Sequence, residues 1–166
     1  MNILPSVIKL NFRKVKNMQI TQRIQSVKDR FDQFSDWEDK YREIIKFGKE
    51  LDQLDEEFQI EKFKIKGCQS QVWLKPSYVN GQVIFNAASD AILVSGIIAI
   101  IIQVYSHSSP QQIMETKADF LKEIGITEHL SLNRTNGLAS MIKQVQMYAF
   151  VFKSLYDKGV MDADNF

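Results

Sequence analysis

The residue in this chain best suited to chemistry is its single cysteine, Cys68. It follows Gly67 and precedes the polar triplet Gln69-Ser70-Gln71, after which the chain becomes apolar. This order predicts a thiol on a loop at the edge of a small sheet, and loops held by regular structure often carry function. A lone cysteine is also a common small hydrophobic residue of protein cores. Composition and position therefore leave both interpretations open.

The sequence contains no motif for several other kinds of functional site. Glycine-rich phosphate loops, zinc-protease helices and the serine elbow of hydrolases are all missing. One cysteine cannot form an intrachain disulfide, a zinc site of several cysteines or an iron–sulfur cluster held within one chain. The two histidines, His107 and His129, are too few for a histidine-rich metal site. We expect no metal, no cofactor and a reducing, cytoplasmic compartment.

Length and charge are those of one ordinary globular domain. The chain has 166 residues, of which 45% are hydrophobic and 25% charged, and its net charge is +1. Such a balance gives no general support for binding nucleic acid or an anionic membrane. Residues 1–17 hold four basic and no acidic residues, so residues 18–166 carry a net charge of −3.

This asymmetry sets the expected domain limits. We interpret residues 1–17 as a disordered extension or the result of a mis-set start codon before Met18, with a targeting segment as the alternative. A single domain is expected over residues 18–157, followed by a frayed tail over 158–166.

Hydrophobic periodicity predicts helices on both sides of a small sheet, which is an α+β fold. Residues 63–67 alternate like a short strand, and residues 71–78 and 82–88 flank Asn80-Gly81, a strong hairpin signal. We therefore expect three antiparallel strands. Helical patterns or helix-start signals occur in the segments 20–34, 35–48, 91–105, 109–112, 118–124 and 131–155.

The segment 91–105 is apolar on almost every side. It is shorter than the roughly 20 residues that a bilayer requires, and Ser95, Gly96 and Gln103 interrupt it. A helix that is apolar all round is usually buried within a domain. We expect it to be the central helix, capped by Ser89 or Asp90, and we expect no membrane association.

The residues around Cys68 resemble those of a known family. The stretch IKGCQSQVWL at 65–74 is similar to the cysteine loop of the SufE family of sulfur acceptors, the partners of SufS-type cysteine desulfurases. Three further stretches resemble family motifs in the same order: DWEDKY at 36–41, SDA at 89–91 before Gly96, and EHLS at 128–131 before Arg134 and Gly137-Leu138. Departures fall at Ala87-Ala88, Ser95 and Leu132. Together the motifs span roughly residues 34–148, and the resemblance implies a fold of the SufE/IscU-like kind.

The resemblance also implies a function. Cys68 would accept persulfide sulfur from a SufS- or CsdA-type desulfurase, stimulate that enzyme and pass the sulfur to an iron–sulfur scaffold of the SufBCD kind. The thiolate would attack the outer sulfur of the donor persulfide, as in thiol–disulfide exchange. The chain would then be a carrier and activator rather than a stand-alone enzyme. Whether it belongs to the SufE or the CsdE branch, and whether it is a monomer or a homodimer, stays open.

Accessory roles follow from the same resemblance. Arg134 would stabilise the sulfur anion and Asp90 would lie near the cysteine loop, although an ion-paired arginine and a simple helix cap are the alternatives. Gly67 would give the loop freedom to move. The triplet Gln69, Ser70 and Gln71 would belong to the loop that meets the partner.

Two rival functions remain. An independent thiol enzyme, such as a hydrolase or peroxidase, would need a base near Cys68, and among histidines only His107 or His129 could serve. A structural module related to the IscU-like fold would leave Cys68 incidental. Cluster assembly on this chain is not expected, because cluster sites use several cysteines.

Overall fold

A computed structural model describes residues 16–161 of the chain. Its helices and strands, in chain order, are α2 (Ile20–Asp32), α3 (Trp37–Glu50), η1 (Glu56–Phe58), η2 (Glu61–Phe63), β1 (Val72–Val79), β2 (Gln82–Ser89), α4 (Ile92–Tyr105), α5 (Pro110–Glu115), α6 (Asp119–Glu123), η3 (Thr127–His129) and α7 (Leu132–Asp157). The predictions for segments 1–17 and 158–166 fall mostly outside the described residues. The single domain over 18–157 stays a prediction.

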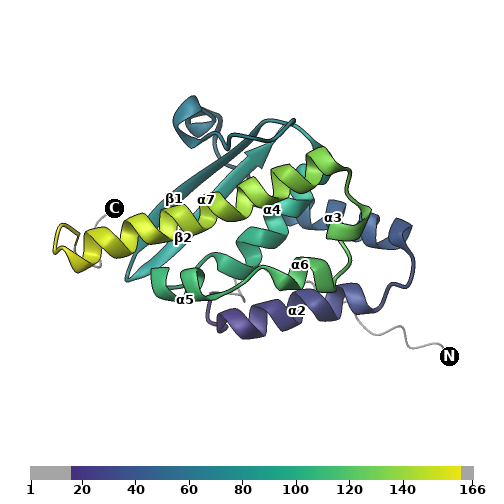
Figure 1. The fold of residues 1–166 in the computed structure, drawn as a ribbon, viewed down its shortest axis with the longest axis horizontal. Coiled ribbons are helices and arrows are strands. Elements are labelled where there is room, and N and C mark those ends of the chain that lie inside the picture. Colours follow the sequence, from purple (N-terminus) through teal and green to yellow (C-terminus); the bar gives the residue numbers. More distant parts are fainter. Residues whose placement is uncertain (1–15, 162–166) are drawn as a thin grey trace.

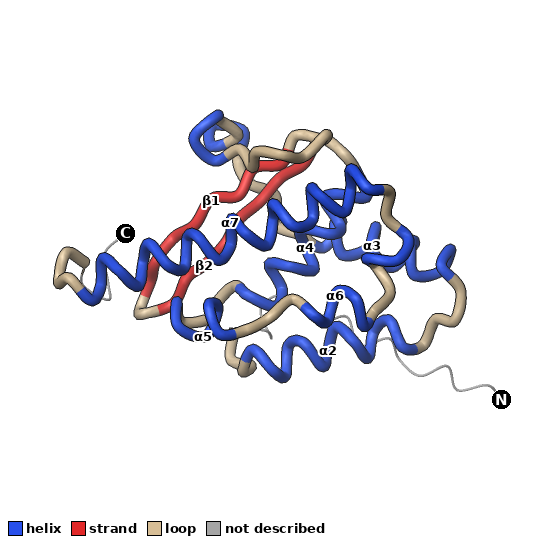
Figure 2. The backbone as a smooth tube through the Cα atoms, viewed as in Figure 1, coloured by secondary structure: helices blue, strands red, loops and turns tan. Residues whose placement is uncertain are grey.

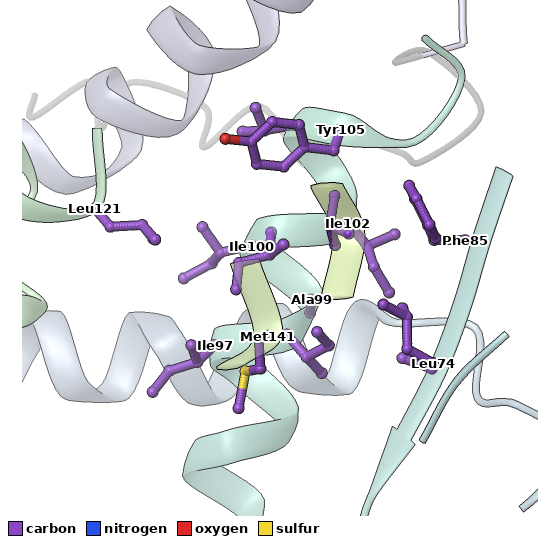
Figure 3. Close-up of a cluster of buried hydrophobic side chains, with 14 of the residues drawn as sticks. Leu74, Phe85, Ile97, Ala99, Ile100, Ile102, Tyr105, Leu121 and Met141 are labelled. Atoms are coloured by element: carbon purple, nitrogen blue, oxygen red, sulfur yellow. The ribbon is translucent and has the colours of Figure 1, made fainter. Parts of the chain in front are cut away.

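Helix α4 lies at the centre of the molecule, as its apolar sequence predicts. Every residue of α4 except Ile92 is buried. Helices α2, α3 and α7 and strand β2 all pack against it (Figure 1). Figure 3 shows side chains of this core, with Leu74 and Phe85 from the strands and Met141 from α7 around those of α4. Within residues 16–161, no helix is both long and apolar enough to cross a membrane.

The sheet is a two-stranded antiparallel hairpin, so the prediction of three strands is wrong (Figure 2). The hairpin itself is confirmed: Val79 pairs with Gln82 across a turn in which Asn80 and Gly81 have positive φ angles of 50° and 77°. In place of a third strand, Lys64 forms one isolated bridge with Trp73. The preceding residues form the 3-10 helix η2.

The third strand does not form because little extended chain remains after η2. Ile65 donates one backbone hydrogen bond to Val72, at 2.8 Å. The chain then turns at Gly67, whose φ is +87°. The alternation of lysine with apolar residues over 63–67 therefore corresponds to a short extended connection that contacts β1, not to a paired strand.

Two glycines allow α3 and α4 to cross in close contact. A Cβ atom built on Gly48 would lie 2.9 Å from the backbone nitrogen of Gly96. A Cβ on Gly96 would overlap the backbone carbonyl of Ile44. No side chain can move aside to relieve these contacts, because the opposing atoms are backbone. This crossing fixes the position of α4 against α3.

Helices α3 and α4 begin differently, and the predicted cap of α4 is wrong. Asp36 caps α3, and its side chain accepts a hydrogen bond from the Asp39 backbone at 2.9 Å. The N-cap residue of α4 is Ala91, without a side-chain cap, so neither Ser89 nor Asp90 occupies that position. Both side chains instead hydrogen-bond to Gln71, although the Ser89 hydroxyl also accepts from the Ala91 backbone at 3.2 Å.

We expect Gly96→Ala to lower the free energy of unfolding by about 2–4 kcal/mol, because the added methyl group must push α3 away from α4. Denaturant unfolding measures this change. The matched control is Ser95→Ala on the same helix, which adds no atoms and should change stability by less than about 1 kcal/mol. Equal stability of Gly96→Ala and the wild type would contradict the close crossing.

Candidate functional site

The loop that carries Cys68 lies between η2 and β1 and reaches the N-terminal part of α7 (Figure 2). Gly67 gives this loop its path. Its φ of +87° is strained for any other residue, and a Cβ there would lie 2.7 Å from the hydroxyl oxygen of Ser140 on α7. The thiol therefore lies on a loop, as its sequence neighbours predict, and the path of that loop requires glycine at position 67. The freedom of movement expected of Gly67 stays a prediction.

The thiol itself rests against a glycine of α7. Its Sγ lies 3.6 Å from the carbonyl oxygen of Gly137, to which the thiol donates a weak hydrogen bond. A Cβ on Gly137 would lie 3.4 Å from that Sγ, so the absence of a side chain leaves room for the sulfur. Cys68 is half-buried and packs against the edge of the core. It is therefore neither a fully buried core residue nor a freely exposed thiol.

Next to the sulfur is a small cavity of about 90 Å³. The loop contributes Cys68, Gln69 and Ser70 to its walls. Helices α4 and α7 complete it with a mainly apolar set, Val94, Ile97, Leu138 and Met141, and with the polar residues Asn133 and Arg134 near the start of α7. Figure 3 draws Ile97 and Met141 among the core side chains beside α4. The lining of the cavity is therefore partly polar and partly apolar.

Arg134 lines the cavity together with Cys68, and the role that the resemblance implies for it stays a prediction. Its side chain is exposed, in the first turn of α7. No acid partner supports the alternative of an ion-paired arginine, because Arg134 forms no salt bridge or side-chain hydrogen bond with the residues from 16 to 161. The guanidinium is free to meet an anion.

Asp90 and Ser89 hold the end of the cysteine loop. The Asp90 carboxylate accepts a hydrogen bond from the backbone nitrogen of Gln71 at 2.9 Å, and the Ser89 hydroxyl donates one to the Gln71 carbonyl at 2.8 Å. Asp90 is not among the residues that line the cavity. Gln71 does not line it either, whereas Gln69 and Ser70 do. Asp90 therefore positions the loop at its junction with β1 rather than contacting the sulfur.

Burial raises the pKa of the Cys68 thiol above its ordinary value. No charged neighbour offsets this effect in the resting structure, since desolvation is the cause of the shift and Arg134 does not contribute to it. The resting sulfur is consequently a neutral thiol at pH 7. The sequence places Gly137 in a stretch that resembles a family motif, but its contact with the thiol is visible only in the structure.

Neither histidine lines the cavity of Cys68. The ring of His129 stacks on Trp37 with centroids 4.1 Å apart, and its Nδ1 lies 3.0 Å from the carbonyl oxygen of Gly125. His107 lies in a different cavity at the other end of α4. Over the described range 16–161, no cluster of three or more His, Cys, Asp or Glu side chains could hold a metal ion.

We expect alkylation of Cys68 by iodoacetamide to be slow at neutral pH and to rise with pH along a curve displaced to higher pH than that of free cysteine. The direction follows from burial, which favours the protonated thiol, while only the thiolate reacts. Mass spectrometry of timed samples measures the rate. The same protein unfolded in urea is the control and should show the ordinary thiol profile. A folded profile at or below the free-cysteine curve would contradict this assignment.

Comparisons with known proteins agree with the resemblance seen in the loop. A family model described as "SufE: Fe-S metabolism associated domain" matches residues 25–149. An uncharacterized SufE-like protein of Synechocystis sp. is 31% identical over 137 residues, covering 82% of this chain and 86% of that protein. An uncharacterized SufE-like protein of Rhizobium etli is 39% identical over 129 residues, covering 74% and 86%.

A solved structure supports the fold. The solution structure of a hypothetical protein from Thermus thermophilus matches with a TM-score of 0.64 and 15% sequence identity, covering 76% of this chain and 93% of that one. At this identity the match concerns architecture alone. The family match spans the cysteine loop, Asp90 and Arg134. The chain therefore belongs to the SufE family.

Proposed function

We propose that this protein is a sulfur carrier that takes persulfide sulfur from a SufS- or CsdA-type cysteine desulfurase onto Cys68. The observation that carries the proposal is a solitary, half-buried thiol that opens on a small cavity beside an unpaired arginine. The family's association with iron–sulfur metabolism gives the sulfur its destination. We take the recipient to be an iron–sulfur scaffold of the SufBCD kind.

The transfer is a single displacement. The Cys68 thiol loses its proton, and the thiolate attacks the outer sulfur of the desulfurase persulfide. A new sulfur–sulfur bond forms on Cys68 while the old one breaks, and the desulfurase cysteine leaves as a thiolate. No net oxidation or reduction occurs, because one sulfur–sulfur bond replaces another. The chain has no second cysteine that could attack the bound persulfide and release its sulfur as sulfide.

The cavity beside Cys68 suits this cargo. A persulfide adds one sulfur atom to the side chain, and a cavity of about 90 Å³ exceeds the roughly 30 Å³ that a water molecule occupies in the liquid. Apolar side chains of α4 and α7, including Val94 and Met141, form part of its wall. A sulfur held against them is shielded from dissolved reductants. We propose that the persulfide rests in this cavity between donor and recipient.

The surface around the cavity suits a protein partner. Leu132 and Ile92, at the starts of α7 and α4, are 77% and 70% exposed, the two highest values among the large apolar side chains of the described residues. Both lie within two residues of side chains that line the cavity. We propose that the desulfurase covers this surface when it delivers sulfur, and that this contact also stimulates the enzyme. The chain is expected to act as an activator, not as a stand-alone catalyst.

The rival thiol enzyme is not favoured. A cysteine hydrolase or peroxidase needs a base or a fixed cation that lowers the pKa of its thiol. Here burial raises the pKa of Cys68, and neither His107 nor His129 lines its cavity. A purely structural role for Cys68 would not explain the cavity beside the thiol or the two glycines, Gly67 and Gly137, that make room for the loop and the sulfur.

We expect incubation with a SufS-type desulfurase and L-cysteine to add one sulfur atom to Cys68. Intact mass measurement, followed by peptide mapping, detects and locates the added atom. Cys68→Ser should gain no sulfur and should lose stimulation of the desulfurase, while its circular dichroism stays unchanged. If Cys68→Ser stimulated the desulfurase fully and the wild type gained no sulfur, the result would contradict the carrier function and favour a structural module.

We expect Arg134→Gln to slow sulfur uptake by about tenfold, because a cation beside the reacting sulfur stabilises the attacking anion. The matched control is Lys143→Gln, which removes another exposed cation of α7 outside the cavity. Initial rates of persulfide formation at saturating desulfurase separate this effect from weaker binding. Equal rates for the two variants would assign Arg134 no part in the transfer.

A further inference from the structure

A second, larger cavity of about 380 Å³ lies at the C-terminal end of α4. Ile102 and Gln103 of that helix line it, whereas the cavity of Cys68 touches α4 at Val94 and Ile97. The two cavities share no lining residue. Nothing in the sulfur-transfer mechanism uses the second one.

The strongest sign of a ligand in this cavity is Gln103. The residue is 1% exposed, yet neither its amide nitrogen nor its amide oxygen has a hydrogen-bond partner within residues 16–161. A buried amide without partners opposes folding, because it loses its bonds to water and gains none in return. Leucine or methionine would fill the same place in an apolar helix without that cost. A ligand in the cavity that forms hydrogen bonds with the amide would explain glutamine at this position.

Further polar side chains around the cavity are also unused. Asp52 and Asn86 line it and form no side-chain hydrogen bond or salt bridge within the described part of the chain. Lys16 lies on the same lining, so the cavity presents one anionic and one cationic group together with two neutral amides. Its apolar lining comes from Leu51, Ile84, Phe85 and Ile102.

His107 is held over this cavity by an unfavourable backbone conformation. Its φ is +58°, which is strained for a residue other than glycine. Its backbone nitrogen donates to Val83 at 2.8 Å, and its carbonyl accepts from Arg23 at 3.2 Å. Burial and the nearby Lys16 and Arg23 lower the pKa of the imidazole. The ring is therefore neutral at pH 7 and can accept a hydrogen bond from a ligand.

We propose that this cavity binds a free α-amino acid with an apolar side chain. Asp52 pairs with the ammonium group, while Lys16 and the amide of Gln103 bind the carboxylate. The ligand side chain packs on Leu51 and Phe85. A zwitterion matches this lining better than an ion of a single charge, because Asp52 and Lys16 each then face a ligand group of opposite charge.

The test is a titration of the isotope-labelled full chain with L-leucine, followed by ¹H–¹⁵N NMR spectra that include the side-chain amides. We expect saturable shifts of the Gln103 amide and of the end of α4, with a dissociation constant on the order of 1 mM. The compounds 4-methylpentanoate and isoamylamine are L-leucine without its ammonium group and without its carboxylate, respectively, and each should bind about tenfold more weakly. Absence of shifts up to about 10 mM L-leucine, or equal binding of either fragment, would overturn the proposal.

Variants separate binding from a purely structural role of the amide. Gln103→Leu should raise the melting temperature by about 2–4 °C, since it removes an unpaired polar group, and should weaken L-leucine binding at least about tenfold. Asp52→Asn, on an exposed side chain, should weaken binding without lowering stability. Gln144→Leu, on α7 and outside both cavities, is the matched control and should leave binding unchanged. Undiminished binding by Gln103→Leu would refute the assignment.

Discussion

The structure depends on covering one helix on every side. Thirteen of the fourteen residues of α4 are buried, and each large apolar side chain among them gains about 1.5–3 kcal/mol by leaving water. Since α4 has no polar face, the neighbouring helices and β2 must enclose it all round. The glycine crossing with α3 brings one neighbour as close as backbones allow. The two cavities lie where this enclosure is incomplete, one toward each end of α4.

Features that depend on local pattern could be predicted from the sequence. The apolar run 91–105 predicted a buried central helix because no exposed face was available. Asn80-Gly81 predicted the hairpin because its turn requires two positive φ angles, which both residues adopt. The loop position of Cys68 followed from its polar and glycine neighbours. These inferences share one property: the residues that decide the structure are adjacent in the chain.

Features that depend on distant contacts could not be predicted. The extended stretch after η2 alternates like a strand, but only its contacts with β1 decide whether a ladder forms, and it makes just one bridge. Asp90 has the sequence of a cap, yet it bonds to Gln71, nineteen positions earlier. Gly137 comes to lie beside the thiol because α7 crosses the loop. Gln103 looked like an interruption of an apolar run, and only the packed structure leaves its amide without a partner.

The thiol combines two properties that oppose each other. In the proposed function, burial against α7 shelters a persulfide, but the same burial raises the pKa of Cys68 and leaves little thiolate at neutral pH. In the resting structure Arg134 does not offset this effect, although it lines the same cavity. Under the proposed function, the docked desulfurase must therefore change the surroundings of the sulfur, either by drawing the loop out of its cavity or by bringing Arg134 onto the sulfur anion. Reactivity then appears only in the complex, which protects a lone thiol from reacting with other molecules in solution.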